Sequence, residues 1–102
     1  MTPDVITFLP EAEEEIAASV RWYERRRLGL GLEFVAALDR TLTRIAENPR
    51  EFQEWPDDTR YRRAILDRFP YLVFFEIRGT EIEVVAVAHA KQEPGYWRER
   101  GR

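Results

Sequence analysis

The sequence predicts an α+β fold of order β-α-α-β-β-β, in which a helical hairpin packs on one face of a four-stranded, mainly antiparallel, twisted sheet. Three observations support this prediction. Apolar side chains recur every three or four positions through residues 12–45, as in amphipathic helices. Residues 61–90 contain short runs rich in β-branched and aromatic side chains, as in strands. A length of 102 residues fits one domain, which we expect to span residues 1–102.

The first strand and the first helix are expected on either side of a proline. The run "VITFL" (Val5–Leu9) is β-rich, and Pro10 follows it. Proline suits the first turn of a helix, where its missing N–H costs nothing. Glutamates begin this helix and arginines end it near Arg26, which are the charges that the helix dipole favours at each end. Its apolar stripe consists of Ala12, Ile16, Val20 and Tyr23.

The second helix is expected after the glycine-containing break "LGLG" (Leu28–Gly31). Asn48-Pro49 should end it, because the residue before a proline avoids the helical region. A join of four residues makes the two helices an antiparallel hairpin, whose apolar stripes need a sheet to cover them. The stripe of the second helix consists of Phe34, Leu38, Leu42 and Ile45.

Three strands are expected after a polar loop at Pro49–Thr59. They are Tyr61–Leu66, Tyr71–Ile77 and Glu81–Ala90, and the short turns between them make neighbours antiparallel. The last run is apolar on both faces, which predicts a central strand. Simple alternation places Ile82, Val84, Ala86 and Ala88 on one face and Glu83, Val85, Val87 and His89 on the other.

Composition argues against several classes of protein. The chain has no cysteine, which removes disulfides and thiolate metal sites and favours the reducing cytoplasm. No apolar run approaches the roughly 20 residues of a membrane span, and the N-terminal charge order is wrong for a signal peptide. The single histidine, His89, makes a poor metal site, and the single serine, Ser19, lies on a predicted helix without an activating partner. We therefore expect no cofactor, no metal and no membrane.

Charge is unevenly distributed along the chain. Residues 1–59 carry 7 basic and 13 acidic side chains, whereas residues 60–102 carry 9 basic and 6 acidic ones. The basic half suits an anionic partner, either nucleic acid or an acidic protein segment. Alternatively, the two halves neutralise each other across the fold, and the sequence leaves both interpretations open.

Four segments occur in an order typical of one superfamily: "WYERRRLGLGLEFVAALDR", "NPREF", "RRAILDRFPYLVFFEI" and "VAVAHAKQEPGYW". On these segments the chain resembles RelE/ParE toxins, on the ParE side, from about Phe8 to Arg100. The resemblance implies a small bacterial toxin of a type II toxin–antitoxin system, with growth arrest and plasmid stabilisation as its effects. It also implies a cognate antitoxin that folds on the toxin, neutralises it and forms a hetero-oligomer with it.

The resemblance implies two different targets. ParE-type members poison DNA gyrase by holding its complex with cleaved DNA, whereas RelE-type members cut messenger RNA on the ribosome. A third interpretation is a non-toxic member retained as an interaction module. The RelE-type reaction needs groups that move protons and stabilise phosphate charge, and the candidates here are His89, Lys91, Arg62 and Tyr96.

Two departures weaken the nuclease interpretation. Tyr71 stands where ribonuclease members are expected to carry an arginine, and Gln92 stands where a second cation is common. We therefore expect protein binding without catalysis and assign no catalytic residue. The residues expected to contact a partner are Arg62, Arg63, His89, Lys91, Tyr96, Trp97 and Arg98.

Structural roles compete with binding for several aromatic and basic residues. His89 suits a hydrogen-bonded position at a strand end, and Trp97 suits docking back onto the sheet, with Tyr96 exposed beside it. Trp22 and Tyr23 are expected to pack the hairpin onto the sheet. Arg62 and Arg63 should point to opposite strand faces, so that one of them faces an uncovered side of the sheet. A solvated end is expected for Arg98, Arg100 and Arg102.

Overall fold

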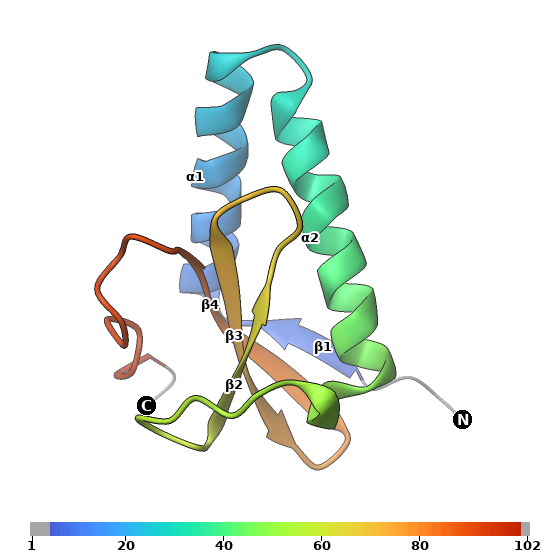
Figure 1. Cartoon of the computed structure of the whole chain (residues 1–102), viewed down its shortest axis with the longest axis vertical. Helices are drawn as coiled ribbons and strands as arrows, with labels where there is room; N and C mark the ends of the chain where they lie inside the picture. The colour runs from blue at the N-terminus through green and yellow to red at the C-terminus, as the bar shows by residue number, and fades with distance from the viewer. Residues whose placement is uncertain (1–4, 101–102) are drawn as a thin grey trace.

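A computed structural model describes residues 5–100, and it confirms the predicted order of elements (Figure 1). No helix in this part of the chain is long and apolar enough to cross a membrane. A single turn of 3₁₀ helix, η1, follows the second helix. The elements are β1 (Val5–Phe8), α1 (Pro10–Arg26), α2 (Leu30–Glu47), η1 (Pro49–Glu51), β2 (Tyr61–Ile65), β3 (Tyr71–Arg78) and β4 (Glu81–His89).

The four strands form one mixed sheet in the order β1-β4-β3-β2. The pairs β2–β3 and β3–β4 are antiparallel, and β1 runs parallel to β4. The predicted central position of the last strand is confirmed, because β4 lies between β1 and β3. The antiparallel hairpin of α1 and α2 packs on one face of the sheet, which we call the helix face (Figure 1).

The helix face is filled by the apolar stripes that the sequence predicted. Phe34 is fully buried, and its ring centroid lies 5.5 Å from that of Tyr23 and 5.3 Å from that of Phe69. Tyr71 completes this aromatic group at 4.9 Å from Phe34. Such stacked and edge-on ring pairs add stability beyond the area they bury. The hairpin is therefore held on the sheet by the pairing of its two stripes with β3 and β4.

The turn between the helices is tighter than predicted, because α2 already begins at Leu30. The carboxylate of Glu24 accepts the backbone N–H groups of Gly29 at 2.8 Å and Gly31 at 2.9 Å. These donors would otherwise be unpaired at the start of a helix. A Cβ at Gly31 would lie 2.8 Å from the carbonyl oxygen of Val20. Glycine at this position therefore lets α1 and α2 approach closely.

The predicted alternation of faces along β4 is correct through Val85 and wrong from Ala86 onward. Phe75 pairs with Val84 and Phe74 pairs with Ala86, so that Val85 is an extra residue on β4, a β-bulge. A bulge moves the following side chains to the opposite faces. The helix-face core therefore contains Ile82, Val84 and Val87, whereas the opposite face contains Val85, Ala86 and Ala88.

Trp22 does not pack the hairpin onto the sheet, although its neighbour Tyr23 does. Its side chain is 44% exposed, and the guanidinium of Arg26 lies 4.2 Å from the centre of its ring. The hairpin projects beyond the turn between β2 and β3 (Figure 1). Its tip therefore lacks a covering layer, and Leu28 and Leu32 are 87% and 73% exposed there.

Candidate functional site

The C-terminal segment Lys91–Arg100, which we call the tail, packs against the sheet face opposite the helices. Trp97 is 1% exposed, and its ring lies 4.5 Å from Phe74, 4.7 Å from Tyr61 and 5.0 Å from Trp55. The predicted docking of Trp97 is confirmed. The expectation of an uncovered sheet face is wrong, because the tail covers this face with a second apolar cluster. We call this the tail face.

Contacts with the loop before β2 fix the outer side of the tail. The guanidinium of Arg98 donates to the carbonyl oxygen of Asp57 at 3.1 Å and lies 5.1 Å from the ring centre of Trp55. Gly95 has a φ of +83°, and a Cβ there would lie 2.9 Å from the Trp55 ring. The tail thus bends around Trp55 in a conformation that glycine permits.

The tail also closes a free edge of the central strand. β1 ends at Phe8 opposite Val84, so among residues 5–100 no strand pairs with β4 on that side from Val85 onward. Arg100 donates to the carbonyl oxygen of Val85 at 3.2 Å, and Gln92 accepts the His89 N–H at 2.8 Å. An exposed strand edge is a template for unwanted pairing, and side chains of the tail remove it here.

Glu15, on α1, binds both the free edge of β4 and the tail that covers it. Its carboxylate accepts the Val87 N–H at 3.0 Å, both terminal nitrogens of Arg100 at 2.9 and 3.0 Å, and the hydroxyl of Tyr96. The side chains of Glu15 and Arg100 are each 18% exposed. The pair is therefore partly shielded from water, and its bidentate geometry makes it stronger than a surface ion pair.

This closure corrects two expectations for the tail. Tyr96 is half-buried instead of exposed, and Arg100 is ion-paired instead of solvated. Arg98 is exposed but bound to the loop, and Arg102 lies outside the described residues. Burial and the adjacent Glu15 carboxylate raise the pKa of the Tyr96 hydroxyl well above its usual value. Tyr96 is therefore a neutral hydrogen-bond donor that holds the tail on α1.

The expected partner-binding residues separate into three groups. A hollow of about 80 Å³ under the tail is lined by Arg63, His89, Tyr96 and Trp97 together with neighbouring residues. Lys91 and Arg98 lie outside it, on the exposed surface of the tail. Arg62 points to the other strand face, as its alternation with Arg63 predicted, and donates to the carbonyl oxygens of Arg50 at 3.1 Å and Phe52 at 2.7 Å.

His89 occupies a hydrogen-bonded position at the end of β4. Its Nδ1 accepts the backbone N–H of Lys91 at 3.0 Å, and its ring packs edge-on against Tyr71 at 5.2 Å. Within residues 5–100, no three histidine, aspartate or glutamate side chains gather as metal ligands would. The hollow thus combines aromatic and aliphatic side chains with one imidazole, one guanidinium, the amide of Gln92 and the carboxylate of Glu93.

A larger groove of about 590 Å³ lies beside the edge strand β2. The end of α2 contributes Arg44 and Glu47, and the strand contributes Arg63 and Ile65. Ile65 is 68% exposed, although it belongs to a strand. The groove therefore combines both signs of charge with an exposed apolar side chain.

Comparison with known proteins identifies the family. Residues 6–94 match the family described as ParE toxin of type II toxin-antitoxin system, parDE. The chain belongs to the ParE toxin family. Membership places it in a type II toxin–antitoxin system, which implies an antitoxin as its partner.

A solved structure of the chromosomal ParDE TA system from P. aeruginosa has the same fold as this ParE-family chain. The TM-score is 0.75 at 16% identity, over 86% of this chain and 97% of that chain. At this identity the likeness shows the fold alone. No curated protein sequence matches the chain. The family match ends at residue 94, so the tail contacts of Tyr96, Trp97 and Arg100 lie beyond it.

Glu15 and Arg100 are the tail-holding residues that the sequence interpretation of this ParE-family chain missed. One signal for Glu15 was available. It lies three residues after Ala12 and four before Ser19, both of which are buried on the inner stripe of α1. A carboxylate at that position must find partners when the helix packs. Arg100 had no comparable signal, because charged residues near a chain end are usually solvated.

Proposed function

We propose that this ParE-family toxin acts in the bacterial cytoplasm by binding and poisoning a protein target, DNA gyrase, and that a cognate antitoxin neutralises it. One observation carries the choice of binding over cleavage. Three of the four groups suited to phosphodiester chemistry are engaged in holding the fold: Tyr96 on Glu15, His89 on the backbone of Lys91, and Arg62 on two carbonyl groups. The fourth, the Lys91 side chain, is a cation that can stabilise charge but is not held beside a free acid or base. A binding surface requires exposed side chains on a rigid frame and no free acid or base.

We propose the exposed surface of the tail and the adjoining part of β2 as the target-binding surface, with Lys91 and Arg98 of the tail and Arg63 of β2 as its cations. The side chain of Lys91 is exposed and has no hydrogen bond or ion pair within the described residues, although its backbone N–H donates to His89. Trp97 and Tyr96 give the tail its conformation, and His89 anchors its start. Arg62 contributes by fixing β2 beside Arg63. The buried Trp97 anchor supports this proposal, because a surface held rigid before binding loses less entropy on association.

We propose that the antitoxin occupies the groove beside β2. Ile65 and the mixed charges of Arg44, Glu47 and Arg63 suit a partner segment with both apolar and charged side chains. Exposed apolar side chains on so small a chain favour association when no partner covers them. Co-expression with the antitoxin should therefore raise the yield and the melting temperature of the toxin.

Induction in growing cells tests the target. Gyrase poisoning predicts growth arrest, an SOS response and intact messenger RNA, all relieved by co-expressed antitoxin. Codon-phased cuts in messenger RNA within minutes would instead establish a RelE-type nuclease, and undisturbed growth would establish a non-toxic interaction module. Either of those two results overturns the proposal.

A charge reversal locates the binding surface. Lys91→Glu should raise the inducer dose needed for growth arrest at least tenfold while leaving antitoxin binding intact. Arg40→Glu makes the same charge change on exposed α2 and serves as the control, because Arg40 lies away from the tail. Equal toxicity of the Lys91 variant and the control would place the target-binding surface elsewhere.

A further inference from the structure

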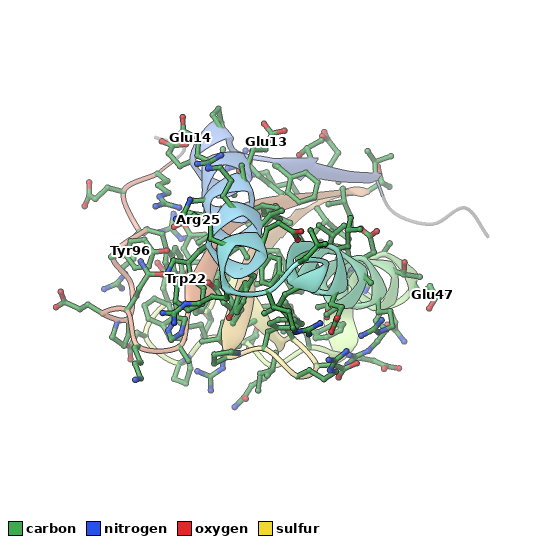
Figure 2. The ribbon with its side chains drawn as sticks, turned by 90° about the horizontal axis from the view of Figure 1, so that it is seen from above. Glu13, Glu14, Trp22, Arg25, Glu47 and Tyr96 are labelled. Atoms are coloured by element: carbon green, nitrogen blue, oxygen red, sulfur yellow. The ribbon has the colours of Figure 1, made fainter. Side chains whose placement is uncertain are left out.

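The outer face of α1 is exposed along its whole length. Its buried residues, Ala12, Ser19 and Tyr23, face the sheet and α2. Figure 2 looks from above and shows Glu14 and Arg25 on the side of α1 that points away from α2. A stripe at helical spacing covers this face, and all of its members are exposed: Glu11, Glu14, Ala17, Ala18, Arg21 and Arg25.

Charge along this stripe changes sign at its centre. Its first half carries the carboxylates of Glu11 and Glu14, and its second half carries the guanidinium groups of Arg21 and Arg25. The helix dipole favours this order, but it does not require the charges to lie on the outer face. None of these four side chains has a hydrogen bond or ion pair within residues 5–100, whereas Arg27, Arg40, Arg60, Arg62, Arg68, Arg78, Arg98 and Arg100 all have one.

The stripe is complementary to itself when two copies of α1 lie antiparallel. With Ala17 and Ala18 at the centre, Glu14 of each copy lies opposite Arg21 of the other. Glu11 then lies nearly opposite Arg25, because the midpoint of that pair is Ala18, only half a residue from the midpoint of Glu14 and Arg21. Two-fold symmetry repeats each pair, so that four ion pairs form. A parallel arrangement would instead bring like charges together.

The middle of the stripe permits the close approach that such pairing needs. Alanines at the contact allow helix axes to approach toward the short end of the usual 8–10 Å range. Trp22, 44% exposed, lies beside the stripe and adds an apolar flank. We propose that the outer face of α1 is a self-association surface, on which a second copy of this chain binds antiparallel with two-fold symmetry.

The expected association is weak and depends on salt. One pair of helices buries less than the roughly 800 Å² per partner of a standard stable interface. Exposed ion pairs contribute little individually and are screened by salt. The dimer should therefore form at high protein concentration and low ionic strength. The proposal concerns the isolated toxin, and it stands or falls independently of the cellular target.

Two charge variants test the complementarity. The basic variant carries Glu11→Arg and Glu14→Arg, and the acidic variant carries Arg21→Glu and Arg25→Glu. Each variant alone should self-associate at least tenfold more weakly than the native chain, because like charges then meet. An equimolar mixture should recover the native affinity or exceed it, because the two variants are complementary to each other. Sedimentation velocity without antitoxin, up to about 1 mM protein, measures these affinities.

A matched control separates charge from folding. The control variant carries Asp39→Arg and Glu47→Arg at exposed positions of α2. Its net charge changes by the same amount as that of the basic variant, and its self-association should be unchanged. Circular dichroism confirms that each variant is folded. The proposal is overturned if the native chain sediments as a monomer at every concentration. It is also overturned if the mixed variants associate no better than each alone, or if the control weakens the dimer equally.

Discussion

The two faces of the sheet are covered by different kinds of structure. Helices of 17 and 18 residues cover the helix face, and their apolar stripes meet β3 and β4. The tail covers the other face with ten residues that form neither helix nor strand. It relies on one large anchor, Trp97, and on hydrogen bonds from side chains to the free edge of β4.

This difference separates global from local stability. A side chain on the helix face belongs to the cluster that joins both helices to the sheet, so its loss weakens the whole fold. A side chain of the tail joins a short segment to a sheet that is already formed. Segments of this kind open at a lower free energy than the core does. Substitutions on the two faces should therefore lower the free energy of unfolding by different amounts and should accelerate amide exchange in different parts of the chain.

The largest effect is expected for Phe34→Ala on the helix face. Phe34 is fully buried and contacts the rings of Tyr23, Phe69 and Tyr71. Its removal leaves a cavity, and the free energy of unfolding should fall by about 3–5 kcal/mol. Urea unfolding followed by far-ultraviolet circular dichroism and by tryptophan fluorescence should shift equally in both signals. A shift in only one signal would contradict a single cooperative core.

A smaller loss of global stability is expected for Trp97→Ala on the tail face. A fully buried aromatic usually costs about 3–5 kcal/mol, but here the tail can detach while β2, β3 and β4 remain paired. Amide hydrogen exchange should accelerate through residues 91–100 and remain slow in α2. Trp22→Ala, at a half-exposed position, is the control and should change neither the global stability nor the exchange of the tail amides. Uniform acceleration throughout the chain would show that the tail belongs to the global core.

The same difference explains what the sequence predicted. The helix face followed from two signals that act locally, the apolar stripes and the stop at Asn48-Pro49. The central position of β4 followed from apolar residues on both of its faces. The bulge at Val85 could not be predicted, because valine and alanine occur on both faces of this part of β4. Without a difference in polarity between the two faces, the sequence does not show where the register shifts.

The candidate site was predictable only in part. The sequence predicted that Trp97 docks on the sheet, and the fold brings three of the candidate binding residues, Arg63, His89 and Tyr96, into one hollow with it. The sequence could not supply the partners of Glu15, because they lie more than 70 residues away from that carboxylate along the chain. Contacts between such distant residues depend on the finished fold, and no local pattern encodes them.

An intermediate effect is expected for Glu15→Gln, at the link between the two regions. Glutamine can still accept the Val87 N–H, but it cannot form an ion pair with Arg100, so the free energy of unfolding should fall by about 1–2 kcal/mol. Exchange of the tail amides should accelerate more than exchange of the Val87 amide. Glu13→Gln, exposed on the same helix, is the control. An equal response to both substitutions would show that Glu15 does not hold the tail.

The smallest effect concerns one tyrosine from each region at alkaline pH. Burial and the neighbouring Tyr71 raise the pKa of Tyr23 to about 12, and burial and Glu15 raise the pKa of Tyr96 further. Tyrosines of the unfolded chain ionise near pH 10. Above that pH the unfolded state releases protons that the folded state retains, so stability present below about pH 10 is lost as the pH rises.

Tyrosinate absorbance of the folded protein measures this effect. Of the four tyrosines, Tyr23 and Tyr96 should ionise late, so the native titration should remain incomplete above pH 10. Tyr96→Phe and Tyr23→Phe should each remove one late step and reduce the alkaline loss of stability. Ionisation of all four tyrosines near pH 10 in the folded chain would contradict the burial of both hydroxyl groups. Loss of the late step only in Tyr23→Phe would instead show that the tail opens before Tyr96 titrates, and would place its docking free energy below that of the helices.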